Sequence, residues 1–162
     1  MPKPESPSLF TAAPLPIAKL APPETLACLR LIRSENVGPV AFRELINRYG
    51  GAAEALNALP EITRRAGSKR PIRICPSDQA EAELAAAARA GAEPVFTIEP
   101  GYPAALAATD APPPMLYIKG RSELLHRPAV AIVGSRSCSA AGAKLAGLFA
   151  HRLGEAGYVI AS

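Results

Sequence analysis

The sequence is poor in the residues that build disulfide, metal and redox sites. Its 162 residues include three cysteines, Cys28, Cys75 and Cys138, and two histidines. The cysteines lie far apart, their number is odd, and no CxxC or Cys/His pair has the spacing of a zinc ligand set. These patterns argue against a disulfide framework and against a structural zinc site.

Long hydrophobic runs and a strong excess of one charge are also lacking. No apolar run reaches the roughly 18 residues that a membrane-spanning helix needs. No basic segment followed by an apolar stretch marks a secretory signal at the N-terminus. Eighteen Lys and Arg against 14 Asp and Glu give a net charge of +4, which permits a polyanionic partner without requiring one. We therefore expect a soluble, cytoplasmic protein with reduced thiols and no membrane association.

What is present is enough apolar sequence for a folded core, since hydrophobic residues make up 49% of the chain. The pattern divides the chain into three parts. Residues 1–21 contain five prolines and no hydrophobic period, which predicts a disordered Pro-rich tail. Residues 22–75 carry apolar positions at helical spacing and predict a small all-helical domain. Residues 76–162 predict the first part of an α/β domain.

The helical part is predicted to start at Pro22 and Pro23, with further helices over 40–48 and 52–59 and a separate turn over 60–65. The segment Asn36-Val37-Gly38-Pro39 lies between the first two helices and resembles a helix-hairpin-helix turn. Asn36 replaces the usual first glycine, and asparagine tolerates a left-handed backbone better than most residues. Such turns offer N–H groups to a nucleic-acid phosphate, but packing or partner docking fits this turn equally well.

The α/β part begins with a predicted helix over 78–90, where Asp78 and Glu81 have capping-box spacing and Gly91 follows the last turn. Strands are predicted over 94–98 and 115–118. The apolar run 129–133, a helix from Ala140 and a strand from Tyr158 predict a βαβ unit of a parallel sheet covered on both faces. A sheet that ended there would leave apolar edges uncovered, so we expect these residues to be the front part of a longer protein.

The turn between the run 129–133 and the following helix, Gly134-Ser135-Arg136-Ser137-Cys138-Ser139, carries the clearest chemical signal. Ligands of open α/β sheets bind at the carboxyl ends of strands, where helix N-termini offer N–H groups. Gly134 admits a close approach, Ser135, Ser137 and Ser139 supply hydroxyls, and the Arg136 guanidinium can hold a phosphate with two hydrogen bonds. The turn lacks GxGxxG and GxxxxGK[ST], which disfavours a dinucleotide site and a P-loop. A plain tight turn with a surface arginine stays open as the alternative.

Other polar residues suggest no catalytic group. His126 and His151 fall on a connector and a helix face, where a surface role is the simpler reading. Cys138 lies near a helix start without a histidine close in sequence, and Tyr102 and Tyr117 flank a proline run where packing is simpler than base stacking. The basic segment 64–73 fits a solvated linker better than a nucleic-acid contact, although both remain open. No cofactor and no metal is predicted.

Three stretches together carry a family resemblance: "VGPVAFRELINRYGGAAEAL", "GYPAALAATDAPPPMLYIKG" and "VAIVGSRSCSAAGAKLAGLFAHRLGEAGYVIAS". Their order and spacing over residues 24–162 resemble the DprA/Smf family of bacterial DNA-processing proteins. The Tyr-Pro…Leu-Tyr-x-Lys-Gly stretch followed by Val-Gly-Ser-Arg is the most specific part.

The resemblance implies an extended Rossmann-like domain, incomplete at the C-terminus here, preceded by a small SAM or helix-hairpin-helix-like domain. It implies a protein without an enzymatic step that binds single-stranded DNA, dimerises, displaces single-strand-binding protein and loads RecA recombinase during natural transformation. The implied DNA pocket is the Gly-Ser-Arg turn, so the candidate DNA and phosphate ligands are Gly134, Ser135, Arg136, Ser137, Ser139 and Lys144. The family continues Ser-Gly-x-Ala-x-Gly-Ile-Asp, of which Ser162 is the opening residue.

Two rival functions remain at this point. Lysine-decarboxylase-like nucleotide phosphoribohydrolases have a similar strand, Gly-Ser turn and helix, and would make the protein an enzyme. The Tyr-Pro…Leu-Tyr-x-Lys-Gly stretch argues against them. A helical scaffold that only docks partners is the second rival.

Overall fold

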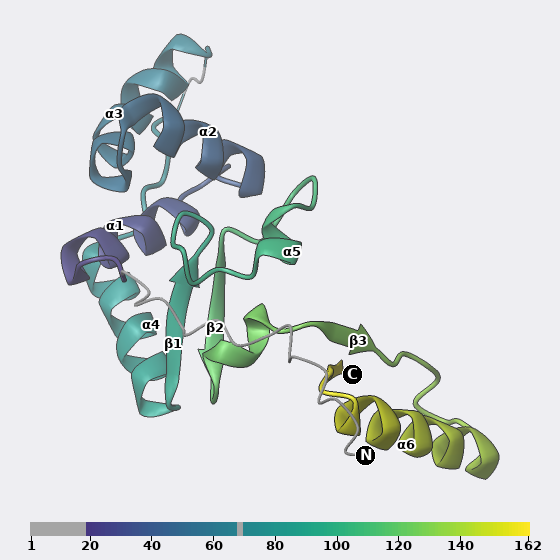
Figure 1. Ribbon diagram of the computed structural model, residues 1–162. Helices are drawn as coiled ribbons and strands as arrows, with labels where there is room; N and C mark the ends of the chain where they lie inside the picture. Colours follow the sequence, from purple (N-terminus) through teal and green to yellow (C-terminus); the bar gives the residue numbers. More distant parts are fainter. Residues whose placement is uncertain (1–18, 68–69) are drawn as a thin grey trace, which may run out of the picture.

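The computed structural model describes residues 19–67 and 70–162, and Figure 1 shows how they are arranged. Helices gather at one end, a two-stranded hairpin lies in the middle, and a strand–helix–strand unit lies at the other end. The predicted tail, residues 1–21, falls almost entirely outside the described residues, so its disorder stays a prediction. The proposed domain boundaries stay predictions as well.

Three helices form the first unit: α1 Pro22–Ile32, α2 Pro39–Tyr49 and α3 Ala52–Arg65. α1 and α2 both have proline in their first turn. Its fixed φ suits a helix start, and its missing N–H would have no acceptor there in any case. Gly50 ends α2 in the left-handed conformation, with a φ of 80°. The prediction of a helical N-terminal domain is confirmed.

The predicted helix end at residue 59 is wrong, because α3 continues through Pro60 to Arg65. Pro60 is exposed, so its ring displaces no packed neighbour. Leu56 and Leu59 in the preceding turn are buried in the core. The Thr63 hydroxyl lies 3.0 Å from the carbonyl oxygens of both Leu59 and Pro60. Packing of the apolar face thus outweighs the local tendency of proline to end a helix.

α4 Ser77–Arg89 leads from the helical unit to the hairpin, and its predicted capping box is wrong. The residue at its cap position is Pro76, which has extended backbone angles and no side-chain acceptor. Asp78 therefore lies inside the first turn, where its carboxylate accepts from the Gln79 N–H at 2.9 Å. Glu81 accepts instead from the Ser77 hydroxyl, at 3.0 Å. As predicted, a glycine in the left-handed conformation, Gly91, follows the helix.

The hairpin consists of β1 Ala92–Phe96 and β2 Met115–Lys119 in antiparallel register. The Thr97 N–H donates to the Pro114 carbonyl at 3.0 Å, so these two residues form a hydrogen-bonded pair. In an antiparallel hairpin, hydrogen-bonded and non-hydrogen-bonded residue pairs alternate along the two strands. Pro94, opposite Tyr117, is consequently in a non-bonded pair, and its missing N–H falls on the outer edge of β1. The next outward N–H of β1, that of Phe96, donates to a carboxylate oxygen of Glu99 at 2.6 Å.

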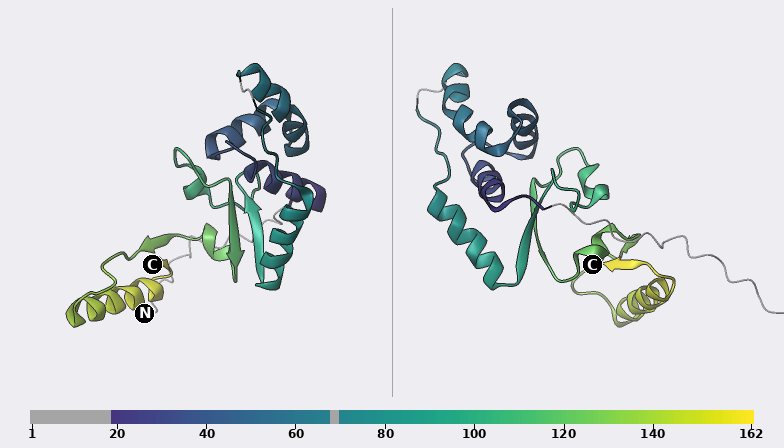
Figure 2. Two further views of the ribbon diagram at one scale, coloured as in Figure 1. Left: turned by 180° about the vertical axis from the view of Figure 1, so that it is seen from behind. Right: turned by 60° about the vertical axis from the view of Figure 1, so that its left-hand side comes forward.

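One apolar core joins the helical unit, α4 and the hairpin. Leu29 of α1 and Phe42 of α2 are completely buried, and Ala80 of α4 and Phe96 of β1 belong to the same cluster. Figure 2 shows α4 and the hairpin lying against the helices from two further directions. The hairpin therefore depends on the helices for its apolar contacts, since an isolated hairpin is marginally stable in water.

The last unit is β3 Ala129–Ala131, α6 Ala140–Glu155 and β4 Val159–Ala161. β3 and β4 are parallel, as the βαβ prediction requires. β3 ends two residues earlier than predicted, and Val133 is 87% exposed. Val130 is half-buried while Ala129 and Ala131 are exposed, so the described residues do not confirm the expected strand covered on both faces.

The unit leaves much of its apolar surface uncovered. Leu145, Leu148 and Phe149 on α6 are each exposed by about half. Two short elements lie between strands: α5 Ala104–Ala107 in the connection from β1 to β2, and the 3-10 helix η1 Ser122–His126 between β2 and β3. The sheets of the described residues are two pairs of strands, so a helical domain followed by small sheets with helices is established, and a complete Rossmann-like sheet is not. No helix within 19–67 or 70–162 is long and apolar enough to span a membrane.

Candidate nucleic-acid interface

The turn from β3 to α6 is an exposed loop that ends in a well-formed helix start. Ser139 is the N-cap of α6, and its hydroxyl oxygen accepts a hydrogen bond from the Gly142 N–H at 3.2 Å. The Ser135 hydroxyl oxygen accepts from the Ser137 N–H, also at 3.2 Å. All residues from Gly134 to Ser139 are exposed. Both serines thus shape the backbone of the turn, while Ser137 has its hydroxyl available to a ligand.

The start of α6 offers hydrogen-bond donors that the helix itself does not use. The first N–H groups of any helix have no acceptor within it. Gly142 donates to the Ser139 side chain and Ala143 donates to the Ser139 carbonyl, so the first turn is satisfied from Gly142 onward. The N–H groups of Ala140 and Ala141 have no acceptor in the described part of the chain. Together with the helix dipole, they favour a bound anion.

Two cations stand at this turn. Arg136 lies in the loop and Lys144 on the second turn of α6, and both side chains are exposed. Neither makes a hydrogen bond or ion pair with any residue of 19–67 or 70–162. No Asp or Glu occurs between Glu123 and Glu155, so this turn carries positive charge without a neighbouring carboxylate in sequence. The structure places all six predicted site residues on this one turn and the helix that follows it.

Local packing does not explain why a glycine stands at the start of the turn. A Cβ added at Gly134 would meet open space, and its φ lies outside the left-handed region. Gly134 is thus compatible with the close approach of a ligand, and the described residues contain no neighbour that would require a glycine there.

Three of the other residues singled out in the sequence, Tyr102, Tyr117 and His151, have side-chain partners. Tyr102 is 4% exposed and its hydroxyl donates to the Pro113 carbonyl at 2.7 Å, which makes it a packing residue. The Tyr117 hydroxyl donates to Glu83 at 2.9 Å. Burial and this hydrogen bond raise the pKa of Tyr117 to about 12. His151 lies 3.3 Å from Glu155 on the same helix. Cys138 is exposed, in contrast to Cys28 and Cys75.

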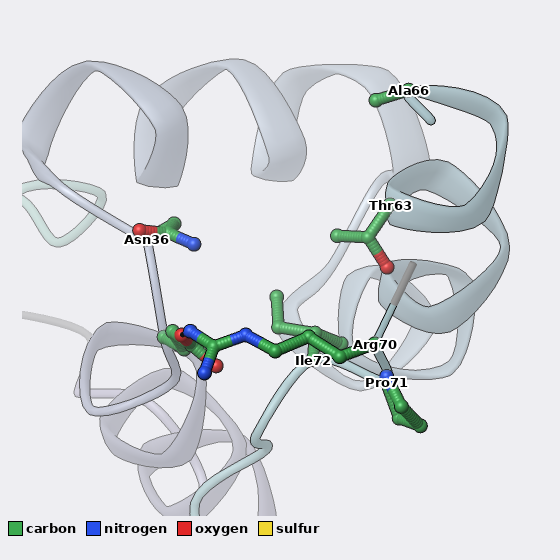
Figure 3. A pocket seen from close by; sticks show the side chains of 7 residues that line it. Asn36, Thr63, Ala66, Arg70, Pro71 and Ile72 are labelled. Atoms are coloured by element: carbon green, nitrogen blue, oxygen red, sulfur yellow. Dashed lines mark hydrogen bonds and ion pairs between the residues drawn. The ribbon is translucent and has the colours of Figure 1, made fainter. Parts of the chain in front are cut away.

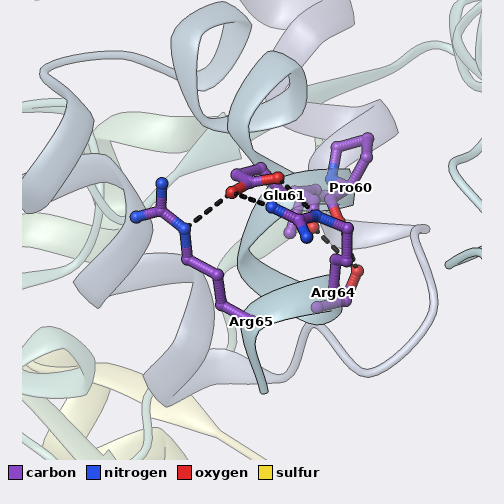
Figure 4. A network of polar contacts seen from close by, with 6 residues as sticks. Pro60, Glu61, Arg64 and Arg65 are labelled. Carbon is purple, nitrogen blue, oxygen red and sulfur yellow. Dashed lines mark hydrogen bonds and ion pairs between the residues drawn. The ribbon is translucent and has the colours of Figure 1, made fainter. Parts of the chain in front are cut away.

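Three arginines of the basic segment 64–73, namely Arg64, Arg65 and Arg70, pair with carboxylates of the helical unit. Arg70 pairs with Glu35 beside a small cavity of about 200 Å³ (Figure 3). Arg64 and Arg65 both donate to Glu61 at 2.7 Å (Figure 4). These hydrogen bonds lower the pKa of Glu61. The linker interpretation is favoured over a nucleic-acid contact, because these arginines are already engaged.

The helix-hairpin-helix-like turn has the backbone that the sequence suggested. Asn36 has a φ of 61°, the left-handed conformation that glycine usually supplies. The next residue, Val37, donates to the Ser34 carbonyl at 3.3 Å, and α2 starts at Pro39. Asn36 lines the cavity of Figure 3 together with Thr63 and Arg70.

Sequence reasoning missed two carboxylates that connect distant segments. Glu83 of α4 accepts from Arg33 at 2.7 and 3.0 Å and from Tyr117, and Glu99 accepts from the N–H groups of Leu20 and Phe96. Neither residue belongs to a recognisable motif, and all of their partners except Phe96 lie far away in the chain. The described residues contain no group of three or more His, Cys, Asp or Glu that could hold a metal ion.

Comparison with known families gives two matches that together span nearly all the described residues. The model of the DprA-like N-terminal HHH domain matches residues 22–86. The model of the DNA recombination-mediator protein A matches residues 93–162. No curated protein matches the chain. The helical unit and the turn at Arg136 thus belong to two domains that are paired in one family. The chain is a member of the DprA/Smf family of DNA-processing proteins that act in recombination and transformation.

Proposed function

We propose that the protein binds single-stranded DNA through the turn from Gly134 to Ser139, with Arg136 and Lys144 as the charged contacts. One observation carries this proposal: two exposed cations without partners in the described chain stand at a helix start whose first N–H groups lack acceptors. A phosphate fits there, because the guanidinium and the N–H groups all donate to anionic oxygens. The contacts proposed here go to the phosphate, which carries no sequence information, so we expect little sequence preference.

Membership of the family supports the finer steps of the proposal. The DNA-bound protein loads RecA recombinase on strands covered by single-strand-binding protein, without an enzymatic step, and it acts as a homodimer. For the domain that follows the helical unit, we propose a Rossmann-like parallel sheet in which the uncovered apolar residues of α6 are packed. The family match favours this function over the phosphoribohydrolase and over a purely partner-docking scaffold.

Cys138 makes a direct test possible without any substitution. It lies within the turn and is exposed, whereas the other two cysteines of the chain are buried. Burial, with smaller effects from Glu24 and Glu99, raises the pKa of Cys28 to about 12, so that thiol reacts slowly with alkylating agents. Alkylation of the native protein by a neutral maleimide therefore reports on the turn.

The experiment measures the alkylation rate of Cys138 by mass spectrometry with and without an oligo(dT) of 30 nucleotides. We expect bound DNA to slow the reaction several-fold at low salt, and protection to vanish at high salt as counterions compete. Blunt duplex DNA and polyphosphate serve as comparison polyanions. An oligonucleotide that binds, as seen by fluorescence anisotropy, but leaves the Cys138 rate unchanged would place the binding surface elsewhere. Loading is tested separately, as a shorter lag in RecA ATPase on strands covered by single-strand-binding protein.

A further inference from the structure

The matched family domains meet between α4 and β1, yet the structure is continuous across that boundary. The first model ends at residue 86 and the second begins at residue 93. Phe96 of β1 is 1% exposed and lies in the same core cluster as Cys28 and Leu29 of α1. Met115 of β2 packs against that cluster as well. The apolar core of the helical unit is therefore completed by the hairpin of the next domain.

Glu83 ties three elements together at the surface of this core. Its two carboxylate oxygens accept from Nε and Nη2 of Arg33, the residue that directly follows α1, at 3.0 and 2.7 Å. One of the same oxygens accepts from the Tyr117 hydroxyl of β2 at 2.9 Å. A two-pronged arginine–carboxylate pair fixes orientation as well as distance. α1, α4 and β2 are thus held in one arrangement by a single side chain.

Glu99 makes a second connection, between the hairpin and the segment that precedes α1. It is 8% exposed, and both of its carboxylate oxygens are occupied by backbone N–H groups. One accepts from Leu20, just before α1, at 2.9 Å, and the other accepts from Phe96, at the end of β1, at 2.6 Å. Beside it, Lys19 pairs with Glu93 of β1. The segment that enters α1 is thereby fastened to β1 and the turn after it.

These contacts have a mechanical consequence. A two-stranded hairpin has too little apolar burial to persist alone, so its stability comes from the contacts with α1 and α4. Opening the hairpin would expose Phe96 and leave the buried carboxylate of Glu99 without its donors, and both changes are unfavourable. The helices in turn would lose the apolar contacts that Phe96 and Met115 make with their core.

We propose that the helical unit, α4 and the hairpin open and close as one cooperative body, and that Glu83 and Glu99 are the positioning residues that join the two family domains into it. The helical domain is accordingly fixed to the hairpin that begins the next domain and is not a module on a flexible tether.

Hydrogen exchange of the wild-type chain tests the proposal directly. Mass spectra are recorded in moderate urea at high pH, where exchange is limited by opening. We expect peptides of α1 and peptides of β1 and β2 to show two-population spectra with one shared opening rate. Opening of β1 and β2 at a rate clearly faster than that of α1 would overturn the proposal.

Two mild variants test the positioning roles. Tyr117→Phe removes one hydroxyl and keeps the ring, and Glu99→Gln keeps the shape of the side chain but replaces one carboxylate oxygen, the acceptor of a backbone N–H, with an amide group. Each is expected to raise the shared opening rate about three- to tenfold, because each removes a hydrogen bond to a charged group. Tyr158→Phe, on an exposed tyrosine of the last unit, is the matched control and should leave that rate unchanged. If the variants accelerate exchange in β1 and β2 alone and leave α1 as protected as in the wild type, the two carboxylates do not couple the domains and the proposal fails.

Discussion

Replacing Arg136 by alanine should weaken the binding of single-stranded DNA while leaving the fold intact. The guanidinium is exposed and has no partner in the described part of the chain, so its removal breaks no internal contact. A surface arginine of this kind contributes little to the free energy of unfolding. The melting temperature of Arg136→Ala is therefore expected to match that of the wild type.

The size of the binding loss follows from the chemistry of one phosphate contact. A charge-assisted hydrogen bond contributes about 1.5–3 kcal/mol, and exposure of this turn to water places the effect at the lower end, about tenfold in affinity. Loss of one phosphate contact also removes one released counterion. The slope of log affinity against log salt should consequently become shallower by about 0.7, the value per phosphate of a single strand. Arg136→Lys keeps the charge and hence the slope, but recovers only part of the affinity, because ammonium lacks the planar fork.

Fluorescence anisotropy with labelled oligo(dT) over a range of salt concentrations measures both quantities on one preparation. Arg152→Ala is the matched control: it removes an exposed arginine from the other end of the same helix, where Arg152 pairs with Glu155. An Arg136→Ala protein with an unchanged melting temperature, unchanged affinity and unchanged salt slope would refute the phosphate contact. A protein that melts earlier and binds in proportion to its folded fraction would show instead that Arg136 is a structural residue.

Three further predictions concern stability. Ser139→Ala removes the cap of α6 and should destabilise that helix by about 1 kcal/mol, seen as faster amide exchange at its first turn. Gly50→Ala forces an alanine into a left-handed conformation and should lower the free energy of unfolding by about 1–2 kcal/mol, measured in urea. Hydrogen bonds from Arg33 hold the pKa of Glu83 below its ordinary value, so this carboxylate stabilises the fold above the unfolded pKa and the contribution is lost as pH falls through the folded one. Glu83→Gln should therefore be less stable than the wild type at pH 7, with a difference in urea midpoint that shrinks below about pH 4.5; a constant difference would contradict the assignment.

The sequence predicted most elements of the fold because their signals are local. Prolines at helix starts, the left-handed Gly50 and the alternation of short apolar runs with an alanine-rich helix all act within a few residues. The errors arose where distant packing decides. α3 passes through Pro60 because Leu56 and Leu59 are buried against another helix, and α4 starts at Ser77, one residue before the expected cap at Asp78. Neither partner surface is visible in the local sequence.

The candidate site was predictable for the same reason, since strand, small-residue turn and helix follow one another directly along the chain. The ties between the domains were not. Arg33 and Glu83 are 50 residues apart, and Leu20 and Glu99 are 79 residues apart. A single glutamate in a helix or a loop looks like an ordinary surface charge until the fold brings its donors to it.

The two edges of the hairpin differ in the backbone hydrogen-bonding groups that they offer to a further strand. A further strand can therefore be added more readily at one edge than at the other. On the outer edge of β1, Pro94 has no N–H and the N–H of Phe96 is taken by Glu99, so an incoming strand would find few donors. The outer edge of β2 presents the backbone groups of Met115, Tyr117 and Lys119, which pair with no strand in the described part of the chain. A further strand, from this chain or from a second copy, can therefore extend the sheet at β2, and the same asymmetry protects the β1 side from edge-to-edge aggregation.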